Sequence, residues 1–155
     1  MKKILIAVSV IASLSIAGEH KVSYPNDYRT WRHVKSMVIN DAHSLSDPFE
    51  GIHHIYANKK ALEGLKSNSY QNGAIFVFDL LTAERTKEAI VEGKRKFIGV
   101  MSYDKTKYKK TGNWGFEAFA GDSQEKRVVK DSGISCFQCH VGVEDKSYVF
   151  SEYRK

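Results

Sequence analysis

Residues 69–83, SYQNGAIFVFDLLTA, carry the clearest structural signal in this chain of 155 residues. Asn72 and Gly73 form a dipeptide that is typical of tight turns, and the apolar run that follows is typical of a buried strand. Because side chains alternate along a strand, Phe76 and Phe78 share one of its faces. The segment therefore predicts a β-sheet with aromatic side chains on one side.

Three further segments show the apolar or alternating pattern of strands that pair with this one. They cover residues 49–58, 96–104 and 114–122. Residues 42–48 predict a loop. The polar stretch at 84–95 predicts either a helix or the arm of a long hairpin.

Two segments predict helices. Residues 59–67 have the composition of a short helix, and residues 28–40 follow a turn at 24–26. In the latter segment the larger side chains recur at helical spacing, at Tyr28, Trp31, Val34, Lys35 and Val38. The prediction is an α+β fold, in which an antiparallel sheet packs against a few helices in one domain.

The N-terminus predicts a secretory signal peptide. Lys2 and Lys3 precede an apolar stretch that ends in small residues at 15 and 17, and cleavage after Ala17 leaves a domain of residues 18–155. The alternative is an uncleaved membrane anchor, but the apolar stretch is short for a transmembrane helix. We therefore expect a periplasmic protein with no membrane span after cleavage.

The charge of the chain points to no particular macromolecule. The formal net charge of +6 falls to +4 when cleavage removes the two N-terminal lysines. A mildly basic surface suits an acidic partner protein. The aromatic-interleaved basic patch of nucleic-acid binders is missing, so no nucleic-acid partner is expected.

Residues 133–142, GISCFQCHVG, hold both cysteines of the chain, Cys136 and Cys139, and His140 follows directly. Such a pair is compatible with a redox switch, half a zinc site, a short disulfide or covalent haem attachment. A thioredoxin-type pair would follow the first strand of its domain, and a zinc site would need a second pair of ligands. A disulfide across two residues closes almost no loop.

The adjacent histidine favours haem attachment, especially behind a signal peptide. In this interpretation one haem c is bound covalently through Cys136 and Cys139, and His140 is the proximal ligand of the iron. No methionine or histidine follows His140 in the chain, although Met37, Met101 and several histidines precede it. An open sixth position on the iron is therefore expected, which favours ligand binding or chemistry over electron relay.

Six stretches together resemble the cytochrome P460 family, which includes the β-sheet cytochromes c′ known as cytochrome c′-β. They occur in the order of the family and cover nearly all of the mature chain, at residues 24–31, 49–58, 70–81, 97–104, 112–119 and 136–154. The resemblance implies an antiparallel sheet packed with helices, a covalent haem, proximal His140 and a homodimer. Family members oxidise hydroxylamine or related nitrogen oxides, or bind nitric oxide and other small gases.

The resemblance also bears on the pocket opposite His140. The P460 enzymes carry a lysine, five residues past the glycine of the turn, that cross-links to the haem. Phe78 occupies that position here, so the resemblance implies no cross-link and a character close to cytochrome c′-β. Phe76 and Phe78 would face the haem and Phe49 would complete a dry cap that admits small neutral gases. The alternative is that these phenylalanines belong to the ordinary core of the sheet.

His53 stands where the P460 enzymes place an arginine near the pocket. It would donate a hydrogen bond to a bound ligand or relay a proton, and the alternative is an ordinary half-buried or surface histidine. The function expected from all these features is that of an exported mono-haem c-type cytochrome that binds nitric oxide or a similar small ligand. One alternative is an oxidoreductase acting on hydroxylamine or nitric oxide, and another is an electron carrier with a redox partner protein.

Overall fold

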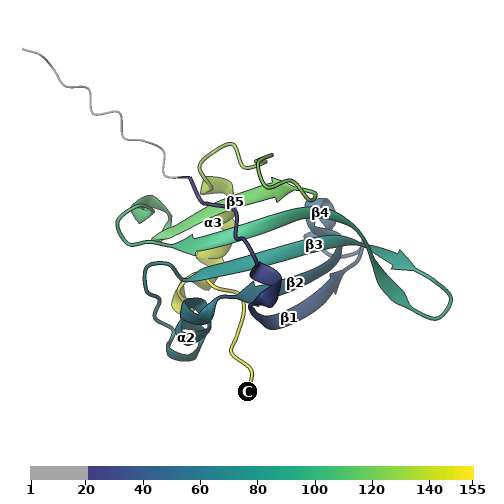
Figure 1. The fold of residues 1–155 in the computed structure, drawn as a ribbon, viewed down its shortest axis with the longest axis horizontal. Helices are drawn as coiled ribbons and strands as arrows, with labels where there is room; N and C mark the ends of the chain where they lie inside the picture. The colour runs from purple at the N-terminus through teal and green to yellow at the C-terminus, as the bar shows by residue number, and fades with distance from the viewer. Residues whose placement is uncertain (1–20) are drawn as a thin grey trace, which may run out of the picture.

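The computed structural model describes residues 21–155, so the predicted signal peptide and its cleavage after Ala17 lie outside the described residues. Five strands form one antiparallel sheet whose spatial order is the chain order (Figure 1). The strands are β1 (Arg32–Ile39), β2 (Gly51–Ala57), β3 (Ile75–Arg85), β4 (Ile90–Tyr103) and β5 (Trp114–Ala120). The helices are α1 (Ser46–Phe49), α2 (Lys59–Ser67) and α3 (Ile134–His140), with 3-10 turns η1 (Tyr28–Thr30), η2 (Lys109–Thr111) and η3 (Val141–Lys146).

The predicted α+β class is confirmed. The strands predicted from residues 49–58, 69–83, 96–104 and 114–122 appear as β2, β3, β4 and β5. Helix α2 has the predicted bounds, and the Asn58 side chain caps its first turn by accepting a hydrogen bond from the Ala61 amide at 2.9 Å. The loop predicted at 42–48 ends in the single helical turn of α1.

The helix predicted over residues 28–40 is wrong. Only the short η1 turn is helical there, and Arg32–Ile39 forms the edge strand β1. The pairing of β1 with β2 is irregular between His33 and Lys35, which inserts Val34 as an extra residue. This bulge shifts the two-residue alternation by one position, so the apolar spacing imitates a helix.

Of the two interpretations of residues 84–95, the hairpin arm is confirmed. Strands β3 and β4 continue past the body of the sheet and turn between Arg85 and Ile90. The arm extends well beyond the other strands at the right of Figure 1. Its side chains are mostly exposed.

The two faces of the sheet pack against different segments. On one face, strand residues such as Ile55, Phe76, Met101 and Phe116 pack against α2, α3 and the segment after them. We call this the aromatic face. On the opposite face, the segment that precedes β1 crosses the sheet and buries a second cluster (Figure 1), made of Val22, Tyr28, Val77, Ile98, Val100 and Phe119.

The opposite face also buries a charge. Asp79 is fully buried, accepts a hydrogen bond from the Tyr28 hydroxyl at 2.7 Å and pairs with Arg95 at 2.7 Å. Burial and the bond to Asp79 raise the pKa of Tyr28, so its hydroxyl stays protonated. Because Asp79 is paired and hydrogen-bonded, it ties the N-terminal segment to the sheet. Within residues 21–155, no helix is long and apolar enough to cross a membrane.

Candidate functional site

Helix α3 carries both cysteines and His140 on the aromatic face of the sheet. The Asp131 carboxylate caps its start by accepting hydrogen bonds from the Ser135 amide at 2.8 Å and the Gly133 amide at 3.1 Å. Residues three and four positions apart share one side of a helix, so Cys136 lies on the same side as Cys139 and His140. The helix therefore presents two thiols and one imidazole together.

Gly133 allows α3 to begin close against β5. Its φ is +84°, and a Cβ added there would lie 2.8 Å from the Cβ of Phe116. Only glycine adopts this conformation freely and leaves space for the neighbouring strand. The close approach places Cys136 half-buried against the core, whereas Cys139 is exposed. Burial raises the pKa of the Cys136 thiol, with a smaller contribution from the charge of Asp131.

The His140 ring has one nitrogen engaged and the other available. Its Nδ1 lies 2.7 Å from the backbone carbonyl oxygen of Tyr148, and a carbonyl only accepts, so Nδ1 donates. Burial lowers the pKa of His140, which keeps the ring neutral and leaves the lone pair on Nε2. The rings of Phe116 and Phe150 pack against it at centroid distances of 4.9 and 5.0 Å. This is the arrangement of a metal-ligating histidine whose second nitrogen is fixed by the protein.

A second group of rings lies elsewhere on the aromatic face. Phe78 stacks on His53 at 4.5 Å and on Phe97 at 5.8 Å between ring centroids. Phe49, at the end of α1, meets Phe78 and Phe97 edge-on at 5.8 and 5.9 Å. We call these four residues the ring cluster. The structure thus brings together Phe49, His53 and Phe78, three of the residues singled out from the sequence.

Phe76 lies on the same face as Phe78 but has different neighbours. It is buried and contacts Tyr70 and Trp114 at ring centroid distances of 5.8 and 6.0 Å. These contacts belong to the core beside α2. Among the phenylalanines of β3, Phe78 is therefore the one in the ring cluster.

His53 contains a buried polar atom that no other group satisfies. The residue is 3% exposed, and its Nδ1 has no hydrogen-bond partner among residues 21–155. Burial lowers its pKa to about 4, and the nearby charges of Lys35 and His54 act in the same direction. Buried polar atoms are almost always hydrogen-bonded, so this neutral imidazole calls for a partner other than the described residues.

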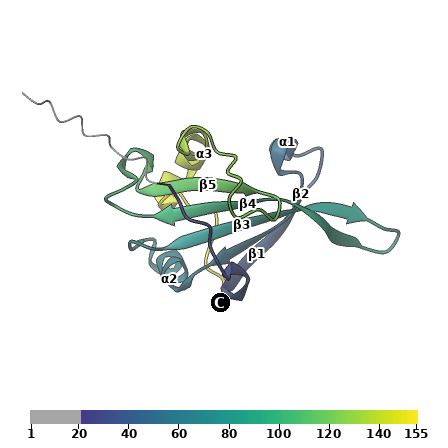
Figure 2. The same cartoon turned by 45° about the horizontal axis from the view of Figure 1, so that its top comes forward.

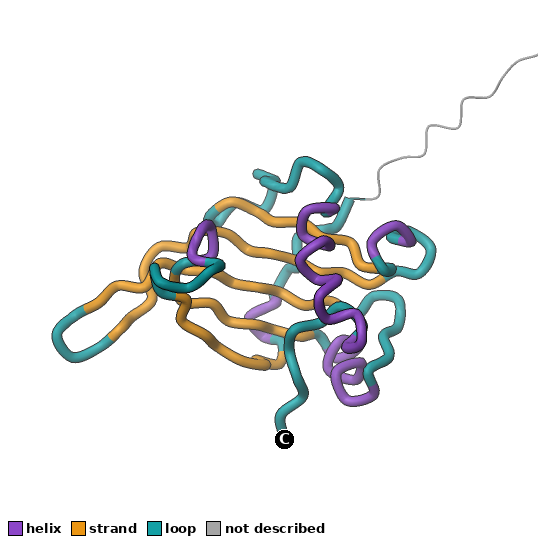
Figure 3. Tube along the Cα trace, turned by 180° about the vertical axis from the view of Figure 1, so that it is seen from behind, coloured by secondary structure: helices purple, strands orange, loops and turns teal. Residues whose placement is uncertain are grey.

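Residues 21–155 cover part of the aromatic face incompletely. Helices α1 and α3 lie over this face (Figures 2 and 3). In the ring cluster, Phe49, Phe78 and Phe97 are all only half-buried. Next to Phe78 across the sheet stand Gly99 and Ala118, whose small side chains add little bulk to the face.

These features fit a haem. The available Nε2 of His140 suits its iron, and the two thiols on the same side of α3 suit covalent attachment. The half-buried phenylalanines and the 49% exposed Phe150 offer apolar surface to a flat aromatic group. The unpartnered His53 nitrogen adds a polar group beside that surface.

Lys35 was not predicted as a site residue. It pairs with Ile55, which pairs with Phe78, so its side chain projects from the aromatic face. It is half-buried, and its charge reaches His53. The segment was assigned to a helix, which hid the alternation that would have placed Lys35 on this face.

Phe97 and Phe150 were also missed. The sequence could have indicated Phe97, because it stands two residues before Gly99 in a predicted strand and so shares a face with it. Phe150 follows the last helical turn in an irregular segment, where no periodicity indicates a direction.

Comparison with known proteins gives one clear result. The family model described as Cytochrome P460 matches residues 25–151, which is most of the chain. The match includes the whole sheet, the ring cluster and α3. No curated protein matches the chain.

Proposed function

Because the chain belongs to the cytochrome P460 family, we propose that it is an exported c-type cytochrome with one haem that binds nitric oxide or a similar small ligand. Membership of this family implies haem binding. The observation that carries the finer proposal is the pairing of two features on one face of the sheet. One is His140 with an available Nε2, and the other is a half-buried ring cluster that contains an unpartnered histidine nitrogen.

Helix α3 provides the attachment in this proposal. Cys136 and Cys139 would hold the haem through thioether bonds, and His140 Nε2 would be the proximal ligand. When bound, the haem supplies an iron with one position free for a small ligand. The Tyr148 carbonyl fixes the His140 ring through Nδ1, which strengthens Nε2 as a donor.

The ring cluster determines what can approach that free position. Phe49, Phe78 and Phe97 exclude water and disfavour anions, because their rings offer no hydrogen bonds to replace hydration. His53 is neutral at pH 7, so one ring nitrogen carries a proton that it can donate to a bound ligand. A surface of aromatic rings with a histidine donor beside it suits a small neutral gas better than a charged substrate.

One observation favours a second candidate function, that of an electron carrier. Met37 pairs with His53 across the sheet, so its thioether projects from the same face, and it is 38% exposed. A methionine ligand would close the sixth position of the iron and raise its reduction potential. The coordination state of the iron separates the two functions.

The first experiment is an optical spectrum of the ferric and ferrous protein, before and after nitric oxide. A high-spin spectrum with an ordinary c-type Soret band that shifts on nitric oxide supports the proposal. A low-spin six-coordinate spectrum supports the carrier instead. A strongly red-shifted ferrous band would indicate a cross-linked haem, and turnover of hydroxylamine with an electron acceptor would then support the oxidoreductase.

Covalent attachment is tested separately. Haem should remain with the wild-type chain on a denaturing gel, and should be lost from a variant that combines Cys136→Ala with Cys139→Ala. Retention of haem by the double variant would overturn attachment through these cysteines. A matched Ser135→Ala variant, on the same helix, should retain the haem.

Export and assembly complete the proposal. We propose cleavage after Ala17 and, as the family resemblance implies, a homodimer. Strand β1 is an edge of the sheet and carries the exposed side chains of Met37 and Val38, which a second copy can cover. Mass spectrometry of the protein from the periplasm tests the cleavage site. Sedimentation of wild type and Val38→Asp tests the dimer, which should weaken in the variant.

A further inference from the structure

The segment that holds His140 in place has an unusual backbone. Ser147 and Tyr148 both adopt left-handed conformations, with φ of 54° and 67°. Residues other than glycine enter this region at an energetic cost, and they persist there only where surrounding contacts hold them. The Tyr148 carbonyl that accepts from His140 Nδ1 belongs to this strained pair.

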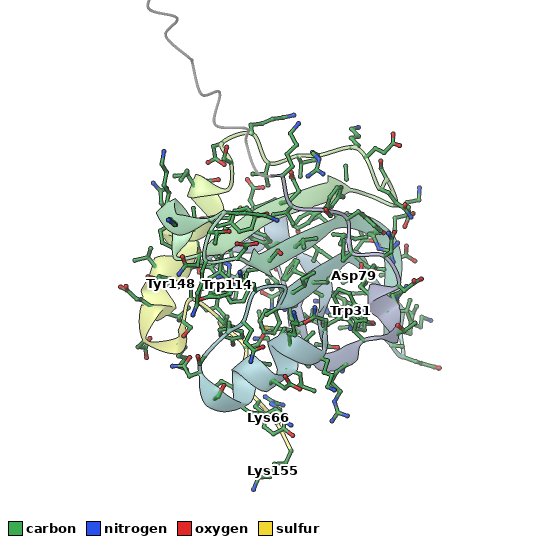
Figure 4. The ribbon with its side chains drawn as sticks, turned by 60° about the vertical axis from the view of Figure 1, so that its left-hand side comes forward. Trp31, Lys66, Asp79, Trp114, Tyr148 and Lys155 are labelled. Atoms are coloured by element: carbon green, nitrogen blue, oxygen red, sulfur yellow. The ribbon has the colours of Figure 1, made fainter. Side chains whose placement is uncertain are left out.

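Trp114 holds Ser147, the first residue of this pair, by a hydrogen bond. This side chain is fully buried at the start of β5, and its Nε1 donates to the Ser147 carbonyl at 3.0 Å. The Ser147 carbonyl and the Tyr148 amide share one peptide plane. The hydrogen bond from the indole fixes this plane, and with it the direction in which the Tyr148 carbonyl points. Figure 4 shows Trp114 beside the segment that carries Tyr148.

Asn68 holds the same segment from a different element. Its Nδ2 donates to the Asp145 carbonyl at 2.8 Å, and its own carbonyl accepts from the Ser147 hydroxyl at 3.0 Å. Asn68 is the C-terminal cap of α2 and is itself left-handed. Two elements far from α3 in the sequence therefore fix the segment that carries the Tyr148 carbonyl.

We propose that Trp114 is a positioning residue for His140, with Asn68 as its second anchor. By fixing the Tyr148 carbonyl, the Trp114 indole keeps the Nδ1 hydrogen bond short and the Nε2 atom strongly basic. A strongly donating proximal imidazole stabilises ferric iron and lowers the reduction potential. The inference deepens the proposed function and rests on it, because the readout is the bond between iron and His140.

The test compares haem-loaded wild type with Trp114→Phe, which removes the indole N–H and keeps an aromatic ring. We expect a lower iron–histidine stretching frequency in the ferrous resonance Raman spectrum and a higher reduction potential. The matched control is Val77→Ala, a buried residue on the opposite face of the sheet, which should lower stability without moving the frequency.

A second variant keeps the inference testable if Trp114→Phe does not fold. Asn68→Gly removes only the bond to the Asp145 carbonyl, and glycine tolerates the left-handed backbone. It should shift the frequency in the same direction by a smaller amount. An unchanged frequency in a folded Trp114→Phe protein overturns the inference, and so does an unchanged Asn68→Gly if Trp114→Phe cannot be made. Wild type that carries no haem overturns the proposed function instead.

Discussion

The two sides of the candidate haem site are built from different interactions. His140 is held by a chain of directional hydrogen bonds that runs through Tyr148 and Ser147 to Trp114. The ring cluster is held by contacts between aromatic rings, and the buried Nδ1 atom of His53 within it has no hydrogen-bond partner among the described residues. The two sides therefore differ in how completely the described residues satisfy their polar atoms. In the proposed haem site, the chain itself fixes the proximal ligand His140, whereas a bound ligand would complete the opposite side.

The largest effect is expected on the proximal side. His140→Ala removes the imidazole that the Tyr148 carbonyl orients, so the iron should lose its histidine signature in the optical and Raman spectra. The cysteines remain, so haem should still stay with the denatured chain. An unaltered iron spectrum would refute the role of His140.

Phe78 and Phe76 provide the sharpest contrast within one strand. Phe76→Ala should lower the free energy of unfolding by ~3–5 kcal/mol, because a buried phenylalanine leaves a cavity. Phe78 is half-buried, so Phe78→Ala should cost less, about 2 kcal/mol. Only Phe78→Ala should alter the Soret band and the affinity for nitric oxide.

Urea unfolding and ligand titration of both variants check this contrast. Equal spectral changes in Phe76→Ala and Phe78→Ala would remove the distinction between the core and the ring cluster. Phe78→Lys is a further probe of the same position. A haem spectrum and ligand affinity that Phe78→Lys leaves unaltered would show that Phe78 does not face the haem.

His53 should make stability depend on pH. Its pKa is lowered from 6.5 to about 4 in the folded chain, so between these values the unfolded chain binds more protons than the folded one. The free energy of unfolding should therefore rise with pH across this window and level off above it. Between pH 5 and pH 7 the gain from this residue is about 2 kcal/mol.

Urea titrations of wild type and His53→Phe at the two pH values isolate this term. Phenylalanine keeps a ring against Phe78, and His140 contributes its own pH dependence equally to both proteins. The slope should be smaller in His53→Phe. Identical slopes would mean that His53 is not desolvated in the folded protein.

The smallest effect is expected at Lys35. The Lys35 charge contributes less than burial to the lowered pKa of His53, so Lys35→Gln should raise that pKa modestly toward its usual value. An NMR titration of the His53 ring measures the shift. Lys87→Gln, on the exposed hairpin arm, is the matched control and should leave the His53 titration unchanged.

The parts of the fold that follow a single local rule were predictable. Strand β3 follows from a tight turn and an apolar run, and α2 from a short helical pattern with an asparagine before it. Strand β1 was not predictable, because its bulge at Val34 breaks the alternation on which strand prediction depends.

The candidate site shows the same limit. Cys136, Cys139 and His140 are adjacent in the sequence, so a spacing motif can identify them. Trp114 and Asn68 act on Tyr148 from positions 34 and 80 residues away in the chain, through hydrogen bonds that no motif encodes. The position of Lys35 on the aromatic face follows only from the pairing of β1 with β2.

The order of the strands in the sheet has a consequence for how the molecule assembles. Every strand pairs with its neighbour in the chain, so each strand can join the sheet as soon as it follows its predecessor. The cysteines come after the last strand. During N-to-C synthesis, all five strands are therefore expected to be complete before the segment with the two cysteines emerges. The haem would then meet a preformed surface rather than nucleate the fold.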